Sequence, residues 1–210
     1  LMPDGKALQM ATSHNLGQNF SKPFEIKFLD KDEKEKYVWI TCWGASTRLI
    51  GALIMVHGDD KGLVLPPKIA PIQIIIIPIY YEEKEREKVL EKCRKVLEKL
   101  KKNNFSCMID EREEYTPGWK FNEWELKGIP LRIEIGPKDV KEKTIVLARR
   151  DIGEKIKIKE EKVVEKVKEV LEEIQKNLFE KAKNFLNKNI FVAKSLEELK
   201  DIVKNKGGFI

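Results

Sequence analysis

The chain has 210 residues, of which 41 are Lys or Arg and 35 are Asp or Glu, so its formal net charge is +6. Apolar residues make up 41% and charged residues 36%, a composition that supports a packed core and excludes disordered, collagen-like and disulfide-stapled classes. The longest apolar runs, Leu49–Val56 and Ile74–Ile79, are far shorter than the roughly 20 residues that span a bilayer. Three cysteines without a CxxC pair indicate free thiols in the cytoplasm, and two distant histidines argue against a metal site in this chain. The small positive excess is compatible with a polyanionic partner.

The first seventy residues are predicted to form strands and one apolar helix. Two strand-like runs on either side of a charged turn are typical of an antiparallel hairpin. The polar run Thr12-Ser13-His14 is predicted to lie in a loop. A later run is apolar on nearly all sides and long enough for two helical turns, which predicts a buried helix. The expected elements are hairpin strands Glu25–Leu29 and Tyr37–Cys42, the helix Leu49–Val56 and a short strand Leu63–Leu65.

After Pro71 the pattern changes to alternating strands and amphipathic helices. Four consecutive isoleucines from Ile74 predict a strand buried on both faces, and Leu131–Ile135 alternates in a way that predicts a half-buried strand. This order of elements indicates an α/β domain. In chain order the expected elements are strand Ile74–Ile77, helix Glu82–Lys102, strand Phe105–Asp110, helix Pro117–Gly128, and strands Leu131–Ile135 and Thr144–Ala148.

The tail is rich in Lys and Glu. It predicts a long helix over Glu160–Lys188, a short strand over Ile190–Val192 and a last helix over Leu196–Lys204, which a capping box opens. The chain begins on Leu1 and ends on a Gly-Gly-Phe-Ile turn, from which we expect a fragment of a longer protein.

One short segment of the first part has the residues of a ligand site. The glycine and alanine after Trp43 leave room for a ligand, and the indole can wall a small apolar pocket. Arg48 falls in the first turn of the apolar helix, where a cation opposes the helix dipole, so we expect an anion such as phosphate beside it. The alternative is an arginine that reaches solvent or pairs with a nearby carboxylate. Thr12 and His14 can donate hydrogen bonds to a small polar ligand, with an ordinary solvated turn as the alternative.

Three segments resemble the prolyl-tRNA synthetases, in the order found in that family. Met2–Phe20 resembles the proline-loop region, and Trp43–Pro67 resembles motif 3 of class II synthetases in the form used by the archaeal and eukaryotic branch. Pro117–Asp139 is similar to the anticodon-binding domain of the same family. The resemblance is strong from Leu1 to about Asp151 and weak through the tail.

The resemblance implies an α+β chain in three parts. Residues 1–70 would be the C-terminal part of a class II antiparallel-sheet catalytic domain. Residues 71–155 would be an α/β anticodon-binding domain with a mixed sheet, and residues 156–210 a truncated C-terminal α/β extension. Motifs 1 and 2 of the class are missing, so we expect this chain alone to be catalytically incomplete. Any zinc site of the family is expected only in a C-terminal part beyond this chain.

The implied function is proline–tRNA ligation. Proline would react with ATP, accompanied by Mg²⁺, to give prolyl-adenylate, and the prolyl group would pass to tRNA(Pro) in a cytoplasmic homodimer of the full-length enzyme. Such a reaction needs no covalent enzyme intermediate, so positioning and charge stabilisation supply the catalysis. The alternative is a non-catalytic tRNA-binding or regulatory relative. The intact Thr12-Ser13-His14 and Ser46-Thr47-Arg48 argue against it, because a binding-only module does not need ATP and proline contacts.

The matched positions also imply the site residues. Arg48 would be the catalytic residue, holding the γ-phosphate or stacking near adenine. The expected ATP-binding residues are Gln9, Thr12, Ser46 and Arg48, and the expected proline-binding residues are Thr12, His14, Trp43, Gly44 and Ser46. The expected anticodon-binding residues are Phe121, Glu125, Arg132, Lys138 and Asp139, since unstacked bases are read by aromatic stacking and by hydrogen bonds to their edges. Without the resemblance, Phe121 would be read as core and Glu125 as surface.

Overall fold

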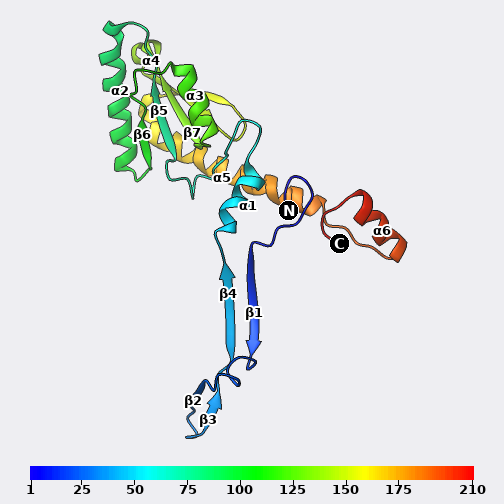
Figure 1. Cartoon of the computed structure of the whole chain (residues 1–210). Coiled ribbons are helices and arrows are strands. Elements are labelled where there is room, and N and C mark those ends of the chain that lie inside the picture. Colours follow the sequence, from blue (N-terminus) through cyan, green and yellow to red (C-terminus); the bar gives the residue numbers. More distant parts are fainter.

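The computed structural model describes residues 1–210. Figure 1 shows a compact part, a long two-stranded arm that projects from it and a helical tail. Almost all burial is in the compact part, because apart from Ser21 and Ala52 every buried residue lies from Val64 onward. None of the helices combines the length and the apolarity that crossing a membrane requires.

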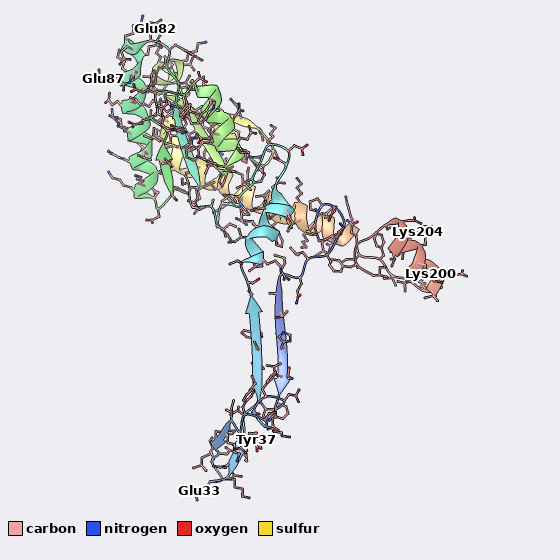
Figure 2. The ribbon with its side chains drawn as sticks, in the orientation of Figure 1. Glu33, Tyr37, Glu82, Glu87, Lys200 and Lys204 are labelled. Atoms are coloured by element: carbon pink, nitrogen blue, oxygen red, sulfur yellow. The ribbon has the colours of Figure 1, made fainter.

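The arm consists of two antiparallel ribbons placed end to end. In the longer ribbon, pairing runs from Ala11 opposite Ala45 to Gly17 opposite Ile40. The shorter ribbon lies at the far tip, where Figure 2 shows Glu33 and Tyr37. The strands are β1 (Ala11–Gly17), which pairs with β4 (Ile40–Ala45), and β2 (Lys27–Leu29), which pairs with β3 (Glu35–Tyr37).

One prediction for the arm is wrong and another is confirmed in part. The polar run Thr12-Ser13-His14 lies in β1, not in a loop, because β4 satisfies its backbone hydrogen bonds although neither face of the strand is buried. The two predicted hairpin strands pair antiparallel only at the tip, where Lys27 lies opposite Tyr37 and Val38 N donates to Ile26 O (3.2 Å). From Ile40 the second of them pairs with β1 instead.

Helix α1 (Arg48–His57) follows the arm directly. The predicted helix is confirmed, but its predicted burial is wrong, because Ala52 is its only buried residue and Ile50 is 63% exposed. A helix that is apolar all round is covered only where a neighbour packs on it, and here that neighbour is the long helix α5 (Val163–Lys188).

A five-stranded mixed sheet forms the centre of the compact part. Its strand order is β6-β5-β7-β8-β9, with β5 parallel to both neighbours and the last two pairings antiparallel. The predicted mixed sheet is therefore confirmed, with one edge strand that was not predicted, β9. The strands are β5 (Ile74–Pro78), β6 (Cys107–Ile109), β7 (Leu131–Ile135), β8 (Thr144–Arg149) and β9 (Lys155–Lys159).

Helices cover both faces of this sheet (Figure 1). Ile74 and Ile76 join the core formed with α2 (Glu83–Lys102) and α5, whereas Ile75 and Ile77 pack under α3 (Pro117–Leu126). This division confirms a strand buried on both faces. The remaining helical elements are α4 (Pro137–Glu142), which was not predicted, the 3₁₀ turn η1 (Glu160–Lys162) and α6 (Leu196–Asn205).

The tail begins inside the core and ends far from it. The first half of α5 buries its apolar side against the sheet, and its second half runs out towards α6 and both chain termini (Figure 1). The predicted strand after α5 is only a single bridge between Ile190 and Phe209. Gly208 N donates to the carbonyl oxygen of Gly5 (3.1 Å), which ties the two ends of the chain together. The division of the chain at residues 70 and 155 stays a prediction.

The backbone before the sheet packs directly against the end of α3. Gly128 ends α3 in a Schellman turn, with Ile129 N donating to Trp124 O (3.2 Å). Leu63 N donates to the carbonyl oxygen of Leu126 at 2.9 Å. A Cβ at Gly128 would lie 2.6 Å from the carbonyl carbon of Leu63, so only glycine permits this approach.

We expect Gly128→Ala to destabilise the fold more than Gly153→Ala. Both glycines have φ +73°, but Gly153 has nothing within 4 Å of its Cβ position. Gly153→Ala should therefore cost about 1–2 kcal/mol from the left-handed backbone alone. Gly128→Ala should cost about 1–3 kcal/mol more, because the methyl group must displace the backbone of Leu63. Urea unfolding of the two variants measures the difference, and equal losses would contradict the close-packing argument.

Candidate functional site

A cavity of about 260 Å³ opens where the arm meets α1. It gathers all four residues expected to bind ATP, together with Gly44 from the expected proline set. Its lining residues are Gln9, Met10, Ala11, Thr12, Gly44, Ala45, Ser46 and Arg48.

The ribbon and the start of α1 place these side chains. Thr12 lies directly opposite Gly44, and a Cβ at Gly44 would be 3.3 Å from the Thr12 hydroxyl oxygen. The glycine therefore leaves the hydroxyl open to the cavity. Ser46 Oγ accepts from the backbone N–H of Arg48 (3.3 Å), which fixes the serine at the first turn of α1.

Arg48 is the first residue of α1, as predicted. Its Nη1 donates to the carbonyl oxygen of Gln9 (3.2 Å), so the guanidinium bridges the start of the helix and the strand leading into the arm. The first turn of α1 contains no acidic residue, and Arg48 forms no ion pair in the chain. The remaining guanidinium N–H groups can donate to an anion at the cavity.

His14 and Trp43 do not line this cavity. In the ribbon, Trp43 lies opposite Ser13 while Thr12 lies opposite Gly44, and successive side chains of a strand point to opposite faces. Trp43 is therefore on the other face from Thr12 and is 83% exposed. His14 shares the face of Thr12, two residues further along the arm. The proposed roles of both residues in proline binding stay predictions.

A second group of expected residues meets on the α3 side of the sheet. The Arg132 guanidinium lies over the Phe121 ring, 4.3 Å from its centroid, and the Lys155 ammonium lies 5.4 Å from the same centroid. Glu134, which is buried, accepts from Arg132 (3.0 Å) and from Lys155 (2.8 Å). Burial of Glu134 means that the predicted half-buried strand β7 is covered on both faces there.

Lys155 and Glu134 were not predicted as site residues. The Lys-Ile-Lys-Ile-Lys alternation of β9 could have predicted the position of Lys155, because a period of two places every lysine of this strand on one face. The same face of the adjoining strands carries Glu134 and Arg132.

A smaller cavity of about 180 Å³ lies beside Glu125 and Arg132, two residues expected to read the anticodon. The Glu125 carboxylate accepts from Lys61 Nζ (3.2 Å). The lining residues are Lys61, Ile75, Trp124, Glu125, Ile129, Arg132, Ala148, Arg149, Arg150 and Gly153.

Lys138 and Asp139 lie apart from this group, on α4 beyond the carboxyl end of β7. The Asp139 carboxylate accepts from Gly136 N (3.0 Å) and from Thr144 Oγ1 (3.1 Å), so it caps α4. The side chain of Lys138 is exposed. The anticodon roles of both residues stay predictions.

The structure groups no three His, Cys, Asp or Glu side chains in an arrangement that would hold a metal ion. Cys42 is exposed, whereas Cys93 and Cys107 are buried. Burial raises the pKa of the Cys93 thiol to about 12, so this cysteine stays protonated and unreactive at neutral pH.

Comparison with known proteins identifies the family. The anticodon binding domain model (HGTP_anticodon) matches residues 73–170. The chain is 55% identical over all of its 210 residues to the proline–tRNA ligase of Natranaerobius thermophilus, and 46% identical over 206 residues, 98% of the chain, to that of Thermofilum pendens. It is 48% identical over its full length to the proline–tRNA ligase of Amoebophilus asiaticus. The chain belongs to the prolyl-tRNA synthetase family.

The chain spans 43% of the length of each of these three relatives. Within this prolyl-tRNA synthetase segment, the match to the anticodon binding domain begins at β5 and ends inside α5. It therefore contains the whole mixed sheet together with the part of α5 that begins to cover it. The resemblance inferred from the sequence is confirmed.

Proposed function

We propose that the chain is part of a proline–tRNA ligase, which activates proline with ATP to prolyl-adenylate and transfers the prolyl group to tRNA(Pro). One observation carries the proposal. A chain similar over its full length to proline–tRNA ligases gathers Gln9, Thr12, Ser46 and Arg48 around one cavity. The full-length enzyme would work as a homodimer in the cytoplasm.

The cavity has donors suited to a triphosphate. Two hydroxyl groups, of Thr12 and Ser46, and the guanidinium of Arg48 face the same space. The proline carboxylate would attack the α-phosphate and release pyrophosphate, and Arg48 would hold the terminal phosphate while that charge redistributes. The cavity lining includes no carboxylate, so Mg²⁺ would be held mainly by the oxygens of ATP.

Proline would lie along the arm from this cavity, on the face that Thr12, Gly44 and His14 share. Glycine at position 44 keeps that face open, because a Cβ there would lie only 3.3 Å from the Thr12 hydroxyl oxygen. A pocket for one small apolar ring discriminates weakly, since a single methylene is worth about 1–3 kcal/mol.

Proline-dependent exchange of pyrophosphate into ATP tests the proposed reaction on the full-length enzyme. A ligase exchanges only when proline is present. A non-catalytic tRNA-binding relative would show no exchange with any amino acid, and this result would overturn the proposal.

The anticodon would bind over the α3 side of the sheet. The Phe121 ring offers a stacking surface, the Glu125 carboxylate accepts from a guanine edge, and Arg132 donates to a base or phosphate. These three side chains come from neighbouring positions on α3 and β7, close to a cavity large enough to take part of a base.

We expect Glu125→Gln to raise the KM for tRNA(Pro) by about tenfold or more, because one base-edge contact is worth about 1–3 kcal/mol. ATP–pyrophosphate exchange should be unchanged, since Glu125 lies on the anticodon-binding domain. Glu98→Gln, on the exposed side of α2, is the matched control and should change neither step. Equal losses in charging and exchange would contradict this division between the two sites.

A further inference from the structure

The segment 58–65 links α1 to the anticodon-binding domain and is docked on α3. Leu63 N donates to Leu126 O (2.9 Å), and Leu65 N donates to Gly128 O (3.1 Å). At Gly62 a Cβ would lie 2.6 Å from the carbonyl oxygen of Leu126. These backbone hydrogen bonds and this close approach fix the docking segment against the C-terminal end of α3. The segment lies before residue 73, where the match to the anticodon binding domain begins.

A buried arginine ties the docking segment to the backbone of Glu125. Arg150, 7% exposed, donates through both terminal nitrogens to the Asp59 carboxylate, at 2.8 and 2.6 Å. Its Nε donates to the carbonyl oxygen of Glu125 (3.0 Å). One guanidinium thereby sets the distance between the turn at Asp59 and the residue expected to read a base. The bond from Arg150 also lowers the pKa of Asp59 to about 2, so this link persists through the physiological pH range.

The turn presents Lys61 to the Glu125 side chain. Asp59 Oδ1 accepts from Lys61 N (2.9 Å), and Asp59 and Gly62 exchange two backbone hydrogen bonds of 3.0 Å. From this fixed backbone, Lys61 Nζ donates to Glu125 Oε1 (3.2 Å). No side chain or backbone group of the chain donates to Oε2, and Glu125 borders the 180 Å³ cavity.

We infer that Lys61 is a positioning residue for anticodon recognition, supplied by the docking segment from outside the anticodon-binding domain. It holds one oxygen of the Glu125 carboxylate and leaves the other to accept from the N–H groups on the edge of a purine base. This inference rests on the proposed function, in which Glu125 contacts the anticodon. If the Glu125 carboxylate could rotate freely, its unbound oxygen would not stay in one position. The carboxylate would then discriminate less well between base edges.

Lys61→Met in the full-length enzyme tests the inference, because methionine keeps an unbranched side chain and removes the charge. We expect the KM for tRNA(Pro) to rise about two- to fivefold, a modest change because Lys61 is 66% exposed, while kcat and ATP–pyrophosphate exchange stay unchanged. Lys61→Arg should restore most of the loss. Lys127→Met is the matched control. It removes an exposed lysine that pairs with Glu123 on the same helix, and it should leave the KM unchanged.

The double variant Lys61→Met with Glu125→Gln separates positioning from direct contact. If Lys61 acts through Glu125, adding Lys61→Met to Glu125→Gln changes the KM no further. A further rise of the same two- to fivefold would show that Lys61 contacts the RNA itself, and a wild-type KM for Lys61→Met would show no role; either result overturns the inference. A wild-type KM for Glu125→Gln alone would instead overturn the proposed anticodon site, and the positioning role with it.

Discussion

Arg48→Ala in the full-length enzyme should lower proline-dependent ATP–pyrophosphate exchange by about 100-fold or more. This is the size of loss seen when a preorganised donor to a developing charge is removed. Arg48 is held at the start of α1 by its bond to Gln9 O and has no acidic partner in the first turn of the helix. Its charge is therefore available to the triphosphate without the cost of breaking an ion pair.

Two further variants make this result specific. Arg48→Lys keeps the charge but loses the planar fork, so an intermediate loss is expected. Arg94→Ala removes an exposed arginine of α2 that pairs with Glu111 and does not line the cavity at Arg48, so exchange should be unchanged. If Arg48→Ala exchanges at the wild-type rate, the phosphate role assigned to Arg48 is wrong.

The buried sheet was the most predictable part of the fold. Four β-branched residues in a row are too few for an independent helix and too apolar for an exposed strand, so Ile74–Ile77 had only one stable environment. The structure places alternate isoleucines of this run in two separate cores. Long amphipathic helices such as α2 were equally clear, because their apolar positions repeat over several turns.

Elements without a one-sided apolar pattern were missed or misread. Strand β1 is polar on both faces, so Thr12-Ser13-His14 gave no period-two apolar signal, and its pairing with β4 is settled by contacts about thirty residues away in the chain. Helix α4 is too short for a helical period to show, although Pro137 and Asp139 are typical of a helix start. The burial of α1 was overestimated because sequence shows how apolar a helix is but not what packs against it.

For the candidate site, motif resemblance supplied residue names but no geometry. It named Thr12 and Arg48, which line one cavity in the structure, yet it could not show that Trp43 lies on the opposite face of the ribbon. Lys61 and Glu125 are 64 residues apart in sequence. Neither is unusual alone, so only the docking of the segment on α3 reveals the pair.

Asp110→Ala should destabilise the fold by about 3–5 kcal/mol, the cost of leaving a buried charge without its partner. Asp110 follows β6 and is 2% exposed. Its carboxylate accepts from Arg112 Nε (2.9 Å) and from Trp124 Nε1 (2.7 Å), and it lies 3.8 Å from the buried ammonium of Lys120. Alanine would leave the Lys120 charge and the Trp124 N–H without this carboxylate. Urea unfolding followed by far-ultraviolet circular dichroism measures the loss.

The pH dependence of that loss identifies its cause. Burial by itself raises the pKa of Asp110, but hydrogen bonds from Arg112 and Trp124 outweigh it and lower the pKa to about 2. Because the folded pKa lies below the ordinary value of an aspartate, the stabilisation is complete above about pH 4 and disappears as the pH falls towards 2. The difference in the free energy of unfolding between wild type and Asp110→Ala should therefore shrink over this range.

Glu111→Ala is the control variant. It removes an exposed partner of Arg94 and should cost at most about 1 kcal/mol. If the loss of stability in Asp110→Ala is small, or does not change below pH 4, the charge of the carboxylate does not hold Lys120 and Trp124 of α3 in place.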